Sequence, residues 1–341
     1  MKPMFLGAAL AIAAIVTFGF LATPFQVILL TRAFVWAMLG LAAWFLLRVA
    51  GRSSLGTAAF FGSGAYVAAL AVTRWGHANF WVVLGLAVAA SVIVGVVVGL
   101  VAGRLSGIHF LLITLAFAEM LRALTTRWGT LGGDDGISGI TRPKTGLFGL
   151  DLRPAENLMW FTGGWFLLLA VLVVVILRSP FGAALIGIRD SESRMAALGY
   201  GSAPYRVAAV GISAFIAGVA GCLNALATRF VSPAEFAPLV SAKALLFAVV
   251  GGIGLVGAAL AAVVITFAED YLSSRFDRWL LLLGVLYVVI AMIGQNPLAR
   301  VRAAVHATVR RPSRRRPSVA DEAATAAART DDENAALELS S

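Results

Sequence analysis

The sequence predicts an all-α polytopic membrane protein with about ten membrane segments, some of them broken or re-entrant. Of its 341 residues, 60% are hydrophobic and 13% are charged, whereas a soluble domain is about 45–50% apolar and about 25% charged. The apolar runs are continuous and lack the period-two alternation of barrel strands, which favours helices. Most of them reach the roughly 20 residues that a membrane-spanning helix needs. They cover residues 4–22, 25–47, 54–73, 80–102, 106–124, 158–177, 207–228, 240–271 and 279–295.

The first run follows Lys2 and has two interpretations. It is compatible with a signal peptide that ends near Ala22 and Thr23. The second run begins almost immediately after it, with Pro24 in the short connection, and this spacing favours a retained helix.

Basic residues predict the orientation, because the cytoplasmic loops of membrane proteins are rich in Arg and Lys. The gap 178–206 contains four arginines against Asp190 and Glu192, and a cluster of arginines follows the last apolar run. We therefore expect this gap and both termini in the cytoplasm, and the loop 125–157 outside. Acidic residues are concentrated in the expected outer loops. They include Asp134, Asp135, Asp151, Glu156, Glu235, Glu269, Asp270 and Asp277.

The run 240–271 is expected to consist of two short segments. With the basic gap and the tail on one side, this run must cross an even number of times, yet a helix of its length spans only about 48 Å. Irregular backbone at membrane depth is tolerated where it is buried in protein or lines a cavity, and broken helices often form transport sites. Close helix packing through small residues is the alternative. The glycines that permit a break are Gly251, Gly252, Gly254 and Gly257.

Residues 1–300 are expected to form one transmembrane domain, and residues 301–341 a cytoplasmic tail. The tail is first basic and then acidic, with few large apolar side chains, so we expect it to be disordered. The net charge of +10 does not indicate nucleic-acid binding, because the basic residues lie in gaps between apolar runs.

No motif indicates an enzyme. The Gly-x-x-x-x-Gly-Lys-Ser/Thr phosphate loop is missing, so we do not expect this chain to hydrolyse ATP. His77, His109 and His306 form no His-Glu-x-x-His pair, and the single cysteine, Cys222, excludes an internal disulfide and a cysteine-based zinc site. We expect no metal and no cofactor on this chain.

Three charged residues lie in apolar runs, where a charge is costly. Glu119 is followed three residues later by Arg122, so the two side chains share a helical face and are expected to pair. Such a pair either lines a path or is structural. Arg32 and Lys243 lie near segment ends and are expected to snorkel toward the membrane surface.

Two segments differ from ordinary membrane helices. Residues 53–66 combine small residues, hydroxyls and aromatic rings, which predicts part of a translocation path or a helix-packing face. Residues 190–199 predict a short helix that ends at Gly199. Its side chains at Met195 and Leu198 would contact a cytoplasmic partner, and a helix lying on the bilayer is the alternative.

Residues 54–66, 104–119, 179–221 and 232–254 follow one another in the order of a known family. With these stretches the chain resembles the permeases of branched-chain amino acid ABC importers, the LivM-type family. The match includes the glycine-rich loop at 132–137, and together the stretches cover most of residues 50–300.

The resemblance implies a permease fold of the vitamin-B12-importer kind in a bacterial inner (plasma) membrane. It also implies a second related permease subunit, two ATPase subunits that bind the ATP, and a periplasmic or extracellular solute-binding protein. The gap 178–206 would be the coupling loop that docks into an ATPase, although its spacing departs from the family's short E-A-A…G signature. The residues expected in this role are Asp190, Glu192, Arg194, Ala196, Ala197 and Gly199.

We therefore expect a non-catalytic importer subunit for branched-chain, hydrophobic amino acids. Urea or short amides are the alternative cargo, and a passive channel or a membrane-embedded transferase are alternative functions. The residues expected near the translocation path are Ser54, Gly62, Gly64, Tyr66, Thr114, Glu119, Gly251, Gly252 and Gly254.

Overall fold

The computed structural model describes most of the predicted transmembrane domain. All described residues belong to one compact unit that spans Met1–Pro297. The described residues are 23–76, 79–103, 105, 107–142, 151–252, 254–275, 278, 281, 284 and 285. The run 4–22, most of the run 279–295 and the tail 301–341 lie outside them.

Six helices in the described ranges are long and apolar enough to cross a membrane, and two apolar helices are shorter. The chain is therefore a mostly helical, multi-pass membrane protein, as predicted, and these eight helices cover the predicted runs from 25–47 to 240–271. The long helices are α2 (Pro24–Trp44) with its π-helical extension η1 (Phe45–Val49), α4 (Phe80–Ala102), α5 (Gly107–Arg127), α6 (Ala155–Arg178), α9 (Ser202–Thr228) and α11 (Leu255–Arg275). The shorter ones are α3 (Thr57–Thr73) and α10 (Pro238–Val250).

The loops expected at 125–157 and 178–206 are shorter than predicted, because the flanking helices extend into them. The second loop also contains a helix that the sequence did not predict, α7 (Pro180–Asp190). Pro180 suits its first position, and the Ser179 hydroxyl accepts a hydrogen bond from the Gly182 amide (3.3 Å). The remaining short elements are η2 (Gly129–Leu131), η3 (Gly133–Asp135), η4 (Pro233–Phe236) and α8 (Glu192–Ala197).

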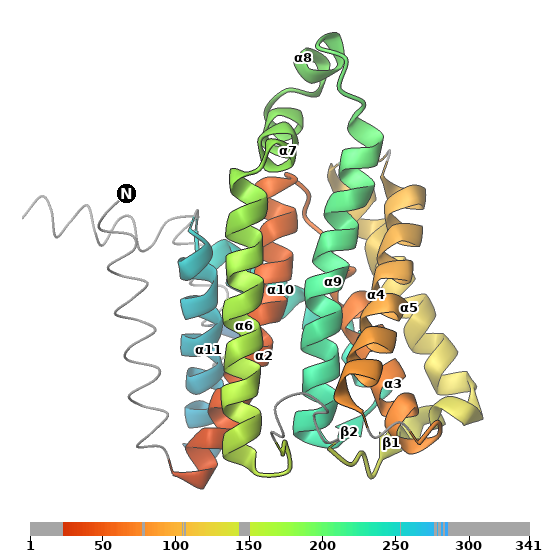
Figure 1. The fold of residues 1–341 in the computed structure, drawn as a ribbon, viewed down its shortest axis with the longest axis vertical. Helices are drawn as coiled ribbons and strands as arrows, with labels where there is room; N and C mark the ends of the chain where they lie inside the picture. The colour runs from red at the N-terminus through yellow and green to blue at the C-terminus, as the bar shows by residue number, and fades with distance from the viewer. Residues whose placement is uncertain are drawn as a thin grey trace, which may run out of the picture. The chain divides into compact units, whose positions relative to one another are not determined.

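Two ends of the helix bundle can be distinguished in Figure 1. At one end α7 and α8 project from the long helices, and we call this the α8 end. At the other end β1 (Ile137–Ser138) and β2 (Phe230–Val231) pair antiparallel, and we call this the strand end. This pairing ties the loop after α5 to the connection between α9 and α10.

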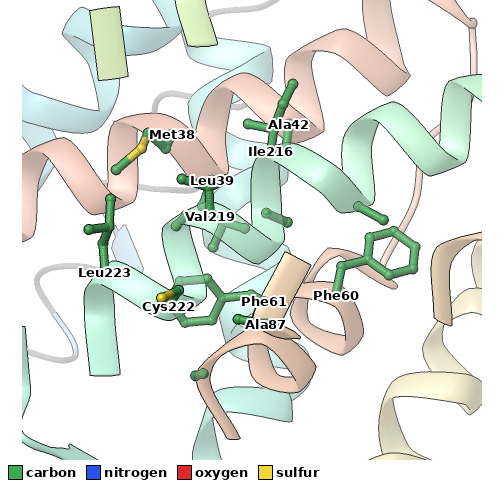
Figure 2. Close-up of a cluster of buried hydrophobic side chains, with 14 of the residues drawn as sticks. Met38, Leu39, Ala42, Phe60, Phe61, Ala87, Ile216, Val219, Cys222 and Leu223 are labelled. Atoms are coloured by element: carbon green, nitrogen blue, oxygen red, sulfur yellow. The ribbon is translucent and has the colours of Figure 1, made fainter. Parts of the chain in front are cut away.

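The core lies where α9 packs against α2, α3 and α4. Small residues let these helices approach closely, since a Cβ at Gly64 would lie 2.6 Å from the carbonyl oxygen of Gly218. A Cβ at Gly218 would in turn lie 2.6 Å from the Ser91 hydroxyl on α4. Figure 2 shows the buried side chains around this contact, among them Met38, Leu39, Ala42, Phe60, Phe61, Ala87, Ile216, Val219, Cys222 and Leu223.

The run 240–271 is broken at the predicted glycines. The helix α10 ends at Val250 and α11 begins at Leu255, and the two helices run antiparallel, with Lys243 Nζ 2.9 Å from the carboxylate of Glu269. The expectation of two short segments was wrong for the second one, which has 21 residues. This helix continues past the apolar run to Arg275, and the charge of Glu269 within the run is paired with Lys243.

Candidate functional site

The helix α3 begins inside the bundle, where amides just before and within its first turn bond to side chains of other helices. The Leu55 N–H donates to Thr114 Oγ1 on α5 (3.1 Å), and the Ala58 N–H donates to Ser241 Oγ on α10 (2.8 Å). Free amides at a helix start need such acceptors where water is excluded. Three elements that are distant in the sequence therefore meet at one polar point.

The extended segment before α3 supplies a further acceptor. Ser54 Oγ accepts a hydrogen bond from the Gly56 N–H (3.0 Å), and both residues are buried. The hydroxyl of Thr57, at the first helical position, is buried and has no hydrogen-bond partner among the described residues. The structure thus brings the predicted residues Ser54 and Thr114 together. Sequence reasoning missed Ser241, for which the only signal was a hydroxyl in an apolar run.

Three predicted path residues lie further along α3 and make packing contacts. A Cβ at Gly62 would lie 2.6 Å from the Phe236 ring, and the ring centroids of Tyr66 and Phe236 are 5.4 Å apart. Gly64 faces Gly218 on α9. Gly62 and Gly64 therefore pack closely against neighbouring elements, as the helix-packing interpretation of segment 53–66 predicts.

The glycines between α10 and α11 form a tight turn. Gly252 has a φ of +67°, which favours glycine, and its carbonyl oxygen accepts a hydrogen bond from the Trp44 indole (3.2 Å). Gly251 lies directly against the backbone of Gly257 and Ala258, with no room for a side chain. The turn is therefore held by backbone contacts and one indole.

The predicted ion pair on α5 is present. Arg122 Nε lies 2.8 Å from Glu119 Oε2, and the two side chains are 47% and 37% exposed. The opposite flank of α5 packs inward through Phe110, Thr114 and Ala118, at a spacing of four residues. The ion pair therefore lies on the flank of α5 that the described residues leave uncovered.

Two charged residues near the strand end have partners on other elements. Lys243 does not snorkel but pairs with Glu269 and lies 5.3 Å from the Trp36 ring centroid. Glu235 lies in the connection between α9 and α10, where a loop was expected, and its partly buried side chain accepts a hydrogen bond from the Asn224 amide (3.1 Å). Burial raises the pKa of Glu235 to about 7, although the Asn224 hydrogen bond acts to lower it.

At the α8 end, the residues of α8 are exposed except Met195, which is half-buried beside Gly187 of α7, and the side chain of Leu198, which follows α8, is 72% exposed. The predicted helix end is correct, because Gly199 adopts a φ of +86°. Its amide bonds to the Ala196 carbonyl (2.9 Å) and the Tyr200 amide to that of Met195 (3.0 Å), which forms a Schellman motif. The helix begins at Glu192 with Ser191 at its N-cap, in agreement with the predicted start at Asp190 or Ser191, and Asp190 is the last residue of α7.

The residues expected to couple to an ATPase therefore lie together on the α7–α8 turn and on α8. Asp190 accepts hydrogen bonds from its neighbour Arg189 (2.9 and 2.7 Å). Arg194, Ala196 and Ala197 are exposed, and they leave α8 free to contact another molecule. Within the described ranges, no three His, Cys, Asp or Glu side chains are grouped in a way that could hold a metal ion.

These features define a polytopic membrane subunit with one projecting helix and interrupted helices in its interior. The family model "Branched-chain amino acid transport system / permease component" matches residues 25–292. The chain belongs to this permease family, which confirms the resemblance seen in the sequence.

Two curated relatives are similar over most of the chain. It is 32% identical over 317 residues to the high-affinity branched-chain amino acid transport system permease protein LivM of Salmonella typhimurium (strain LT2). It is also 32% identical over 313 residues to the protein of the same name from Escherichia coli (strain K12). Each alignment covers 84% of this chain and 72% of the relative. No solved structure matches the chain significantly.

Proposed function

We propose that this chain is the permease subunit of an ATP-binding-cassette importer for branched-chain, hydrophobic amino acids in a bacterial inner (plasma) membrane. Membership in the permease family and the names of both relatives support this cargo. In this proposal a second related permease completes the path. Two ATPase subunits bind the ATP, and a periplasmic or extracellular solute-binding protein delivers the substrate.

The structural observation that carries the proposal is the projecting helix α8. None of its residues is buried, so its surface is available to an ATPase subunit. We place the α8 end in the cytoplasm, because its arginines follow the positive-inside rule. With the expected segments at 4–22 and 279–295, the chain would have about ten membrane segments and both termini in the cytoplasm. We propose a fold of the vitamin-B12-importer kind.

We place the translocation path beside the start of α3 and the flank of α5 that carries Glu119. An ion pair that faced lipid at this depth would be costly, so this flank is proposed to face the second permease across the path. The hydroxyls of Ser54 and Thr114 lie near the same depth of the bundle. Tyr66 and the close contacts at Gly62 and Gly64 would form the wall behind them.

The turn between α10 and α11 is proposed as the part of the path wall that rearranges. Its residues Gly251, Gly252 and Gly254 interrupt a helical hairpin, as discontinuous helices do in many transporters. The hairpin contacts α2 through the Trp44 hydrogen bond.

Uptake measurements test this proposal. We expect that deleting the chain from source cells removes ATP-dependent uptake of labelled leucine and leaves labelled urea uptake intact. Loss of urea uptake with leucine uptake intact would assign the amide cargo instead. Uptake that needs the chain but survives ATP depletion would contradict the importer and indicate a channel.

A substitution on α8 tests the ATPase contact separately. Leu198→Glu places a charge on the most exposed apolar side chain of this segment, so we expect loss of ATPase copurification and of uptake. The matched control is Leu239→Glu, since Leu239 is 58% exposed on α10 near the strand end. Equal copurification of the ATPase with both variants would contradict a docking role for α8.

A further inference from the structure

The first residue of α8 is bound to the start of α9 by two side chains. Glu192 Oε1 accepts a hydrogen bond from Ser202 Oγ (2.6 Å), and Glu192 Oε2 pairs with Arg206 Nη2. The Ser202 hydrogen bond and the positive charge of Arg206 lower the pKa of Glu192, so it stays ionised at neutral pH. The side chain of Arg206 is only 14% exposed, whereas that of Glu192 is 49% exposed. The side chain of Arg206 is therefore held more firmly by its surroundings than that of Glu192.

The same guanidinium also reaches the end of α4. Arg206 Nη1 donates a hydrogen bond to the carbonyl oxygen of Gly103 (3.3 Å), the residue that follows α4. One side chain thus joins α8 to the connection between α4 and α5. A bridge of this kind needs the two separated donor groups of an arginine, which a lysine does not have.

A second arginine lies beside this bridge. Arg52 is 7% exposed, donates to the carbonyl oxygen of Ala102 (3.5 Å) and places its guanidinium 4.8 Å from the ring centroid of Phe110 on α5. Burial and the charge of Arg206 lower the pKa of Arg52 to about 10, so it stays charged at neutral pH. Glu192 is the acid that opposes the repulsion between these two arginines.

This cluster leads to the polar point at the start of α3. Arg52 precedes Leu55 by three residues, and Thr114, which accepts the Leu55 hydrogen bond, lies four residues after Phe110 on α5. Contacts therefore connect Glu192 through Arg206 to the α4–α5 connection, and Arg52 and Phe110 connect this region to the start of α3.

We propose that Arg206 is a positioning residue that transmits the movement of α8 to the α4–α5 connection and the start of α3. This inference rests on the proposed importer function. Arg206 does not touch the ATPase or the substrate in this proposal. It acts by holding Glu192 and Gly103 at a fixed separation, so that ATPase movement at α8 is converted into movement of the path.

The test uses the assembled importer in vesicles, where uptake of labelled leucine and hydrolysis of ATP are measured together. We expect Arg206→Gln to leave ATPase copurification and basal hydrolysis within about twofold, and to lower leucine uptake per ATP about tenfold, a typical size for coupling. The matched control is Arg153→Gln, which removes an exposed pair with Asp151 near the strand end. Leucine uptake per ATP should not change in this control.

A charge exchange separates the bridge from the ion pair alone. Glu192→Arg combined with Arg206→Glu restores the ion pair but leaves the Gly103 carbonyl without its donor, so we expect uptake per ATP to stay as low as in Arg206→Gln. Recovery to the unmodified value would overturn the bridge. Arg206→Lys keeps the charge but cannot bridge both partners, and we expect an intermediate value. This variant decides the question if Arg206→Gln fails to assemble.

Two negative outcomes have different meanings. Normal uptake per ATP in Arg206→Gln, or in Arg206→Lys where only that variant assembles, would overturn the inference while leaving the importer intact. If the unmodified complex shows no ATP-dependent leucine uptake, the proposed function itself fails.

Discussion

At the start of α3 the chain is held by hydroxyl groups from other helices, whereas the turn between α10 and α11 is held by glycine backbone and one indole. The α3 start uses Thr114 and Ser241 as acceptors for amides that have no partner within the helix. The turn depends on the positive φ of Gly252 and on the close approach of Gly251 to Ala258. Both interruptions lie in buried surroundings, where unpaired backbone groups are costly.

Because they are held in different ways, the α3 start and the α10–α11 turn should respond differently to substitutions. An interruption held by hydroxyls should tolerate added volume at its exposed edges but not the loss of an acceptor. An interruption held by glycine contacts should show the reverse behaviour, because added atoms meet backbone that cannot move aside. The α3 start is therefore fixed by specific acceptors, and the turn by close backbone contacts that leave no room for a side chain.

The largest effect is expected from Gly251→Ala. The added Cβ would overlap the backbone of Ala258 and force the hairpin open, so we expect a loss of about 3 kcal/mol or more in the free energy of unfolding. Thermal unfolding in detergent measures the change. The control is Gly254→Ala, whose Cβ would lie 3.9 Å from the nearest atom, the Gly257 amide nitrogen, and should cost less than about 0.5 kcal/mol. Equal stability of the two variants would show that the close approach of Gly251 to the Ala258 backbone does not exclude a side chain there.

The next effect is expected at the α3 start. Thr114→Val keeps the shape of the side chain but leaves the partly buried Leu55 amide without its acceptor, so we expect a loss of about 1–3 kcal/mol. Denaturant unfolding followed by the fluorescence of the native tryptophans checks this. An unchanged midpoint would show that another group or water replaces the hydroxyl.

A smaller effect is expected at Gly252. Gly252→Ala puts a side chain on a residue with a φ of +67°, which costs about 1–2 kcal/mol. Gly252→Asn should cost less, since asparagine tolerates this conformation better. The measurement compares the unfolding temperatures of the two variants. If the alanine variant were the more stable, the positive φ of Gly252 would not be what limits substitution there.

The smallest effect is expected at Thr57, where the substitution should raise the free energy of unfolding or leave it unchanged. Thr57→Val makes the same chemical change as Thr114→Val, but at a buried hydroxyl that has no partner among the described residues. Removing an unsatisfied polar group should leave stability unchanged or raise it by up to about 1 kcal/mol. Destabilisation equal to that of Thr114→Val would show that the Thr57 hydroxyl has an undetected partner.

Part of the candidate site could be predicted from the sequence. Ser54 and Thr114 were both expected near one path, and for Ser54 the signal was that segment 53–66 has small and hydroxyl residues in place of bulky aliphatic ones. The break near Gly251 followed from charge parity and glycine content. Ser241 was missed because it lies 183 positions from the amide that it serves, and a single serine in an apolar run carries no local signal.

The sequence by itself determined the membrane class, the position of most helices and the helix break, because hydropathy, charge bias and glycine content are properties of neighbouring residues. Its permease family was identified from the resemblance of several stretches in the family's order. Only the tertiary structure decided that Lys243 meets Glu269, that Asn224 donates a hydrogen bond to Glu235, and that Arg206 joins α8 to the end of α4. These contacts join separate helices, and a hydrogen bond depends on geometry within about 3 Å. That geometry is fixed only when the helices pack against one another.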